Sequence, residues 1–165
     1  MPHQAQPQSA RRSTIVAVIG PSDAGPAELR AAARAGLLIA EKGWILITGG
    51  RGGVMEAASR GAAEAGGLVV GILPGITAEQ ANPYVRVPIV TGLAEARNAV
   101  IALTASALIA IGKGYGTLAE IGFALKLGRP VVSLGSWEVD PAIAPARSPE
   151  EAVETVKRQI EGSGG

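Results

Sequence analysis

The amino-acid sequence predicts an α/β fold, a single-domain Rossmann-like doubly wound parallel sheet flanked by helices. Apolar runs of strand length alternate with longer segments whose apolar residues recur at helical spacing. Two of these runs lead directly into glycine-rich loops, and each loop opens a helical segment. At 165 residues the chain has the length of one domain, and its core needs no disulfide or metal to fold.

The chain divides into a short tail and one domain. Residues 1–12 are polar and contain proline, which predicts a disordered N-terminal tail ahead of a domain at residues 13–162. Six apolar runs in that domain predict strands at 14–19, 44–47, 68–73, 85–90, 107–111 and 131–134. The remaining segments predict helices at about 26–42, 54–65, 93–103, 118–127 and 149–161, with an irregular loop at 135–146.

Local signals set the helix boundaries. Pro26 suits the first position of its helix, because a proline there loses no hydrogen bond, and Gly43 supplies the stop. Ser148 is a strong N-terminal cap, since Pro149 and two glutamates follow it in the first turn. Gly128 ends the helix before the last predicted strand.

The order of the strands predicts where a ligand binds. Right-handed crossovers favour an order near 3-2-1-4-5-6, which puts the switch point between the first strand and the strand at 85–90. Ligands of such sheets bind at the carboxyl ends of the strands beside the switch point. The loops at Gly20, Gly49 and Gly112 are all expected at that edge.

Composition excludes several classes of function. Cysteine is absent and the one histidine is His3, which excludes thiolate chemistry and argues against histidine catalysis or a metal site. The net charge is +1, so no nucleic-acid or anionic membrane partner is expected. The sequence has neither an apolar run long enough to span a membrane nor an apolar leader, which predicts a cytoplasmic protein.

The stretch at 106–129 carries the strongest site signal. An apolar run is followed by three glycines that alternate with Lys113 and Tyr115, and then by Thr117. Glycine lets backbone approach a ligand closely, and the N–H groups at a helix N-terminus bind anions. The loop after the second strand has the same character, and Ser22 and Asp23 follow the first strand, where they are candidates to contact a ribose or a base. We therefore expect ligand contacts from Gly20, Ser22, Asp23, Gly49, Gly50, Gly52, Gly53, Val54, Lys113, Gly114, Tyr115, Gly116 and Thr117.

Four segments carry a family resemblance: GGRGGVMEAASRGAAEAGG, LVVGILPG, NPYVRVPIVTGLAEARN and GKGYGTLAEIGFALKLGRPVV. Over about residues 15–134 the chain resembles the lonely-guy superfamily of Rossmann-like proteins, and within it the branch of molybdenum cofactor carrier-like proteins. The resemblance implies a homodimer or homotetramer and a phosphate-bearing ligand. Some members of the superfamily hydrolyse nucleoside 5′-monophosphates to base and ribose 5-phosphate, whereas carrier-like members bind molybdenum cofactor.

The resemblance also implies roles for individual residues. The hydrolases carry Pro-Gly-Gly-x-Gly-Thr-x-x-Glu, where this chain has Gly112 to Glu120 with the proline and first glycine replaced. Arg97 and Glu120 fall where the hydrolases carry their catalytic arginine and glutamate. Asn98 stands where the hydrolases have lysine, and with Arg97 it is expected to contact the ligand. The catalytic pair is thus present, while the phosphate loop is altered.

Several of these residues have structural alternatives. Glu120 lies three residues after Thr117, so the pair could form a capping box. Arg97 could be a surface residue. Arg51 has a place in the second loop equivalent to that of Lys113, and each of the two could either contact an anion or be a solvated loop residue. Loop capping is the alternative for Ser22 and Asp23, and Glu56 could pair with Arg60 on a helix surface.

The sequence therefore predicts a binding protein for a phosphate-bearing small molecule, either a nucleotide or a molybdopterin-type cofactor, of the carrier type. The alternative is a nucleoside 5′-monophosphate phosphoribohydrolase that uses Arg97 and Glu120. In that reaction a carboxylate would stabilise positive charge on the ribose, and arginine and loop N–H groups would hold the phosphate. No metal or other cofactor is required for that catalysis; the bound molecule would be molybdenum cofactor or a nucleoside monophosphate.

Overall fold

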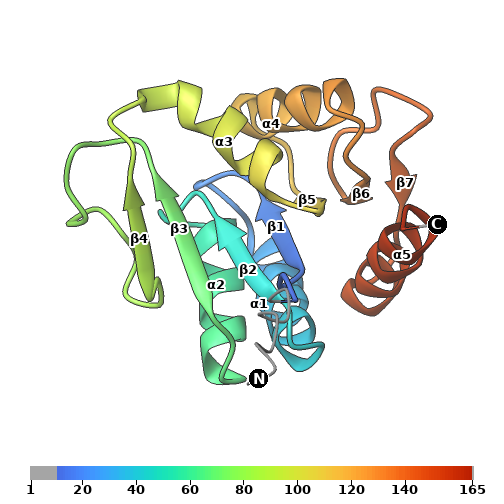
Figure 1. Cartoon of the computed structure of the whole chain (residues 1–165), viewed down its shortest axis with the longest axis horizontal. Coiled ribbons are helices and arrows are strands. Elements are labelled where there is room, and N and C mark those ends of the chain that lie inside the picture. The colour runs from blue at the N-terminus through green and yellow to red at the C-terminus, as the bar shows by residue number, and fades with distance from the viewer. Residues whose placement is uncertain (1–10, 165) are drawn as a thin grey trace, which may run out of the picture.

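The computed structural model describes residues 11–164, so most of the predicted tail lies outside the described residues. Along the chain the regular elements are β1 (Ile15–Ile19), α1 (Pro26–Glu41), β2 (Ile45–Thr48), α2 (Val54–Glu64), β3 (Val69–Leu73), β4 (Val87–Val90), the 3₁₀ turn η1 (Ala94–Ala96), α3 (Arg97–Thr104), β5 (Ala107–Ile111), α4 (Tyr115–Lys126), β6 (Val131–Leu134), β7 (Ala144–Pro145) and α5 (Pro149–Gly162) (Figure 1). The α/β class and all six predicted strands are confirmed.

All seven strands form one parallel sheet in the order β4-β3-β2-β1-β5-β6-β7 (Figure 1). The predicted strand order is wrong at one strand, because β4 pairs with β3 rather than with β1. The connection from β3 to β4 contains no helix, so the chain returns beside the strand that it has just left. The neighbour of β1 on its other side is β5, and the switch point therefore lies between β1 and β5.

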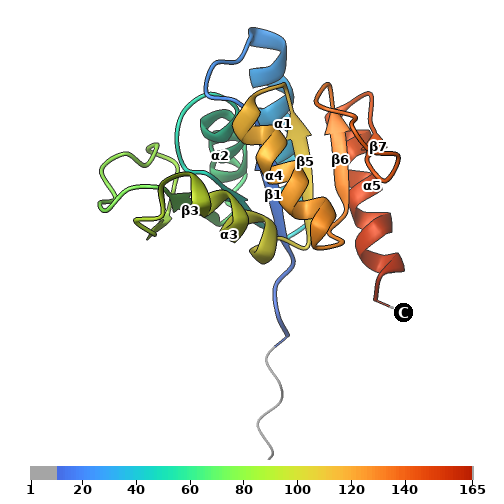
Figure 2. The ribbon, with the colours of Figure 1, turned by 90° about the horizontal axis from the view of Figure 1, so that it is seen from above.

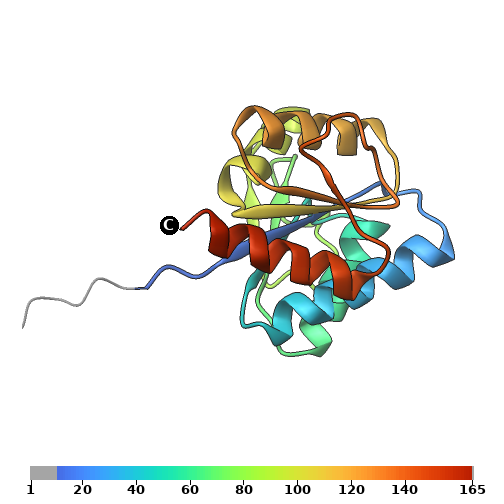
Figure 3. The ribbon, with the colours of Figure 1, turned by 90° about the vertical axis from the view of Figure 1, so that its right-hand side faces the viewer.

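Helices cover both faces of the sheet. Helices α3 and α4 lie side by side on one face, whereas α1, α2 and α5 cover the other (Figures 2 and 3). The two resulting core clusters consist largely of alanine, valine, isoleucine and leucine. Because the strands are parallel and buried on both faces, their residues form nearly continuous apolar runs.

Glycine makes the close packing of α1 against α2 possible. A Cβ added at Gly36 of α1 would collide with the carbonyl oxygen of Ala58 in α2. The same restriction applies in the other direction, because a Cβ at Gly61 of α2 would collide with the carbonyl oxygen of Ala33 in α1. These two helices carry the first residues after two of the glycine loops, so their packing sets how close those loops lie.

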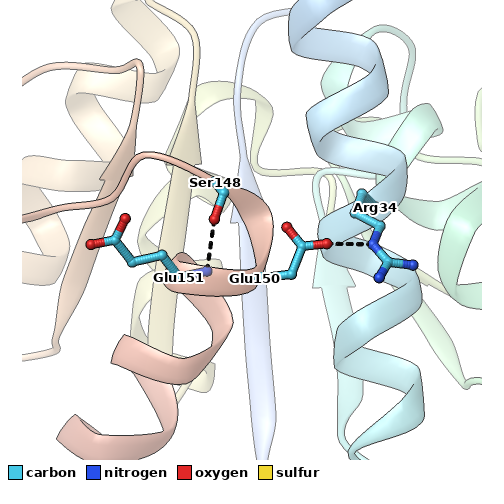
Figure 4. A network of polar contacts seen from close by, with 4 residues as sticks. All are labelled: Arg34, Ser148, Glu150 and Glu151. Carbon is cyan, nitrogen blue, oxygen red and sulfur yellow. Dashed lines mark hydrogen bonds and ion pairs between the residues drawn. The ribbon is translucent and has the colours of Figure 1, made fainter.

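Helix α5 begins as its sequence predicts. The Ser148 hydroxyl accepts a hydrogen bond from the Glu151 N–H at 3.1 Å, and Pro149 occupies the first helical position (Figure 4). Two exposed ion pairs, each at 2.7 Å, join this helix to α1 and its capping residue. Arg34 pairs with Glu150, as Figure 4 shows, and Lys42 pairs with Glu154. Exposed pairs of this kind contribute about 0–1 kcal/mol, so the buried face of α5 dominates its attachment.

Two further predictions need correction. The predicted helix at 93–103 is divided: a 3₁₀ turn at Ala94–Ala96 precedes α3, which continues to Thr104. The predicted loop at 135–146 contains the short strand β7, which pairs with β6. Within residues 11–164 no helix is both long and apolar enough to cross a lipid bilayer.

Candidate functional site

A cleft of about 290 Å³ lies at the carboxyl edge of the sheet, beside the switch point between β1 and β5. Its walls come from the loops after β1, β2 and β5, from the start of α2, and from η1, α3 and α4. The lining residues are Gly20, Pro21, Ser22, Gly49, Arg51, Met55, Glu95, Arg97, Asn98, Gly114, Gly116, Thr117 and Glu120.

The structure brings many of the sequence-predicted residues together in this cleft. Those that line it are Gly20, Ser22, Gly49, Arg97, Asn98, Gly114, Gly116, Thr117 and Glu120. Those that lie outside its lining are Asp23, Gly50, Gly52, Gly53, Val54, Lys113 and Tyr115. Arg51, for which an anion contact and a solvated position were both open, also lines the cleft. Pro21, Met55 and Glu95 were not predicted, and each lies within two residues of a predicted position. The sequence signal that could have identified these three residues as part of the site was their position next to a glycine loop or to Arg97.

Packing requires glycine at positions 20, 49 and 53 of the first two loops. A Cβ at Gly20 would lie 2.6 Å from a methyl group of Val54, and one at Gly49 would lie 2.6 Å from the Arg97 guanidinium. Gly53 has a φ of +63°, and a side chain there would collide with the loop after β1. Gly116 differs, because a Cβ there meets no atom within 4 Å. A larger side chain at Gly116 therefore has space in the unoccupied volume at the cleft.

The first turn of α4 has unused hydrogen-bond donors, and two of its residues, Gly116 and Thr117, line the cleft. Gly114 is the N-terminal cap, and no side chain caps this end of the helix. Within the described part of the chain, no hydrogen bond uses the backbone N–H groups of Tyr115, Gly116 or Thr117. The Thr117 hydroxyl is buried and also has no partner. Free N–H groups and the positive end of the helix dipole together favour an anion.

The capping-box alternative for Thr117 and Glu120 is wrong. It required Thr117 to precede the helix, but α4 begins at Tyr115, and Thr117 lies inside its first turn. Instead, Thr117 and Glu120 both line the cleft. Helix α4 thus begins three residues before the position predicted from its apolar spacing, because Gly114, in an extended conformation, is its N-terminal cap.

Arg97 is buried at the first residue of α3 and is not a surface residue. Its Nη1 donates hydrogen bonds to the carbonyl oxygens of Gly49 and Ile72, which follow β2 and lie near the end of β3. Its Nε is also buried and has no partner in the described structure. Burial lowers the pKa of Arg97, while the nearby Glu120 and Glu95 carboxylates oppose that shift. The guanidinium thus holds two strand ends together through Nη1, and its Nε–H is a buried donor without a partner.

Glu120 is 8% exposed and lies in the same cleft. Burial raises its pKa to about 8, an effect that the Arg97 charge opposes and the Glu95 charge reinforces. At neutral pH the carboxyl group is therefore mostly protonated. A protonated carboxyl can donate one hydrogen bond to a ligand oxygen.

The segment that leads into α3 is held in an unusual conformation. Ala94 has a φ of +50°, in the left-handed region that side chains other than glycine rarely adopt. Its N–H donates to the Pro74 carbonyl at 2.9 Å, which ties η1 to the end of β3. Strained residues of this kind are concentrated at functional sites, and the next residue, Glu95, lines the cleft.

Lys113 and Tyr115 lie against an indole that the sequence did not predict as part of the site. The Lys113 ammonium is 5.7 Å from the centroid of the Trp137 ring. The ring of Tyr115, which is 85% exposed, stacks on the same indole with centroids 6.3 Å apart. No local signal identified Trp137, because it lies in an irregular loop after β6, more than twenty residues along the chain.

Comparison with known proteins places this geometry in a family. The chain is 41% identical to the molybdenum cofactor binding protein of the phototrophic bacterium Rippkaea orientalis, covering 90% of this chain and 98% of that one with a TM-score of 0.86. It is 40% identical to the molybdenum cofactor carrier protein of Chlamydomonas reinhardtii, covering 91% and 99% with a TM-score of 0.81. An uncharacterised protein of Archaeoglobus fulgidus is 46% identical over 138 residues, which are 84% of this chain and 91% of that protein. A family model matches residues 13–161, and the chain thus belongs to the SLOG cluster4 family of the lonely-guy-like superfamily that its motifs indicate.

Proposed function

We propose that this protein binds a phosphate-bearing small molecule of the molybdopterin type in the cleft beside Arg97 and Glu120, as a carrier. The observation that carries this proposal is a set of unused donors at one place: the N–H groups of the first turn of α4, the Thr117 hydroxyl and the Arg97 Nε. Two of these donors, the Thr117 hydroxyl and the Arg97 Nε, are buried, and buried donors without partners cost free energy. An anionic group at the start of α4 would accept hydrogen bonds from donors of this set. The similarity to molybdenum cofactor carrier and binding proteins over nearly the whole chain supports the choice of ligand.

The size of the cleft suits the phosphate end of such a ligand. Its volume of about 290 Å³ is at the lower end of the usual range for small-molecule pockets. Under this proposal the phosphate lies at the start of α4, and the remainder of the molecule extends toward the rim that Arg51 and Ser22 form. A partly exposed cargo fits a carrier, because the cargo must be passed on.

The phosphoribohydrolase remains the second candidate, and one observation favours it: Arg97 and Glu120 line a single cleft. Cleavage of the N-glycosidic bond would place positive charge on the ribose, which an ionised carboxylate stabilises. A pKa of about 8 leaves Glu120 mostly neutral at pH 7, so it offers a hydrogen-bond donor in place of a negative charge. A neutral carboxyl can serve a carrier as a hydrogen-bond donor and a hydrolase as a general acid, so turnover of AMP separates the two candidates.

A pair of glycine variants in one helix tests the binding site. Gly116→Val places a branched side chain at the cleft, whereas Gly122→Val changes an exposed glycine of the same helix that also has open space around it. We expect Gly116→Val to lose at least tenfold in affinity for molybdopterin, measured by fluorescence titration, and Gly122→Val to bind as the wild type does. Equal binding by folded Gly116→Val and wild type would contradict the site.

We also propose that the protein assembles as a homodimer or homotetramer. Strand β4 is an edge strand whose residues are all exposed, and Val87, Ile89 and Val90 are each at least 40% exposed. Ile76 and Leu93, from the segments on either side of β4, are exposed as well. An apolar edge of this kind is a liability in a monomer, and a second copy would cover it.

A further inference from the structure

The unused donors at the start of α4 depend on a loop that has little stiffness of its own. Glycine occupies positions 112, 114 and 116, and glycine has the greatest conformational freedom of any residue. The capping residue Gly114 has no side chain with which to cap the helix. Another part of the protein must therefore hold this loop in the conformation that presents its N–H groups.

One indole contacts three consecutive residues of that loop. The Trp137 Nε1–H donates a hydrogen bond to the Gly114 carbonyl oxygen at 3.0 Å. On either side of Gly114, the Lys113 ammonium lies over the indole and the Tyr115 ring stacks on it at an interplanar angle of 23°. We infer that Trp137 is a positioning residue that fixes the anion-binding turn of α4. That an anion binds at this turn rests on the proposed function, whereas the positioning role rests on the three contacts of the indole.

The hydrogen bond to Gly114 matters because of the geometry of the peptide group. The Gly114 carbonyl oxygen also accepts from the Leu118 N–H at 3.0 Å, so both of its lone pairs are used. In a planar trans peptide the C=O and the following N–H point in opposite directions. Fixing the Gly114 carbonyl therefore fixes the direction of the Tyr115 N–H, the first free donor of the helix.

The Trp137 indole is itself held in place by packing and by a hydrogen bond in its loop. Trp137 is half-buried and packs against the core cluster beneath α3 and α4. The residue before it, Ser136, is buried, and its N–H donates to the Ser133 hydroxyl at the end of β6. The loop after β6, the strand that pairs with β5, thus reaches the anion site, and Trp137 organises the site without lining the cleft.

The test compares Trp137→Phe with Trp44→Phe. Phenylalanine keeps an aromatic ring against Tyr115 and Lys113 but removes the Nε1 donor. Trp44 serves as the matched control because it lies just before β2 in another part of the molecule, among residues such as Thr14 and Glu41. Amide hydrogen exchange is measured along each chain, together with affinity for inorganic phosphate and the melting temperature.

We expect Trp137→Phe to speed amide exchange of residues 112–118 about tenfold relative to the wild type, without a matching change elsewhere. Its phosphate affinity should fall at least threefold, while Trp44→Phe retains wild-type values of both. Saturating phosphate should restore slow exchange in Trp137→Phe, which a general loss of packing would not allow. Wild-type exchange at 112–118 in folded Trp137→Phe would overturn the inference.

A measurement on the wild type decides the matter if Trp137→Phe fails to fold. The Trp137 indole proton should exchange with solvent at least tenfold more slowly than the Trp44 indole proton, for which the described residues provide no hydrogen-bond acceptor. Equal exchange rates for the two indoles would contradict the Gly114 contact. If the loop loosens in Trp137→Phe but the wild type binds neither phosphate nor molybdopterin, the positioning role stands and the proposed function fails.

Discussion

Arg97 and Glu120 line the same buried cleft from two different helices, yet no ion pair joins them among the described residues. Arg97 directs Nη1 to two backbone carbonyls, and the Glu120 carboxylate has no protein hydrogen bond in the described structure. Each group influences the pKa of the other. Two ionisable groups that line one cleft without pairing are both available to a ligand.

The pKa of Glu120 makes the stability of the protein depend on pH. The value is 4.5 for an ordinary glutamate and about 8 in the folded protein, so the folded state binds more protons between those values. The free energy of unfolding should therefore fall as pH rises from about 4.5 to 8, by at most about 1.4 kcal/mol per pH unit. Glu120→Gln should remove this decline and be more stable than the wild type at pH 9. Urea unfolding at pH 5, 7 and 9 measures the free energy of unfolding of both proteins. If this free energy changed equally with pH in the wild type and in Glu120→Gln, the result would argue against a buried neutral Glu120.

Arg97 should matter for folding as well as for binding. Arg97→Met leaves the Gly49 and Ile72 carbonyls without their donor, which should cost about 2–3 kcal/mol of unfolding free energy. Arg86→Met is the matched control, because Arg86 is exposed and its guanidinium makes no hydrogen bond or ion pair within residues 11–164. Denaturant titration compares the two variants. Equal stability of both would show that the carbonyl contacts contribute nothing.

Two glycines should respond to alanine in opposite directions. Gly36→Ala forces a methyl group into the Ala58 carbonyl and should destabilise the protein by about 1–3 kcal/mol. Gly122→Ala adds a methyl group in open space on a helix and should stabilise it by about 0.5–1 kcal/mol. Thermal unfolding of both variants checks the signs. A neutral Gly36→Ala would mean that α1 and α2 can separate at little cost.

The oligomeric proposal predicts a change of mass when a charge is placed on the edge strand. Ile89→Lys puts a cation in the middle of β4, where Ile89 is 43% exposed. Light scattering at micromolar concentration should show a dimer or tetramer for the wild type and a smaller species for Ile89→Lys. A monomeric wild type would refute the proposal, and an unchanged mass of Ile89→Lys would place the interface elsewhere.

Much of this fold could be predicted because its signals are local. The cap at Ser148, the proline at position 26 and the buried apolar runs each depend on neighbouring residues, and the structure confirms the elements that they predict. The position of β4 could not be predicted in this way. It depends on a connection without a helix, and a strand of four residues carries no information about its neighbour.

In the candidate site, too, the features that depend on local sequence could be predicted and those that depend on tertiary contacts could not. The glycine loops and Arg97 could be identified from short motifs, and the cleft gathers residues from each of the three loops. The contact of Lys113 with Trp137 could not be predicted from the sequence, because Trp137 comes from another loop. The state of Glu120 could not either, because burial sets its pKa and burial is a property of the assembled fold.

One experiment tests the central claim most directly: purified wild-type protein is incubated separately with molybdenum cofactor and with AMP. After gel filtration, retained molybdenum is measured by elemental analysis, and free adenine is measured by chromatography. Carrier function predicts about one molybdenum per chain, loss of that molybdenum in Gly116→Val but not in Gly122→Val, and no adenine. Rapid adenine release that disappears in Glu120→Gln, with no molybdenum retained, would contradict the proposed function and establish the hydrolase.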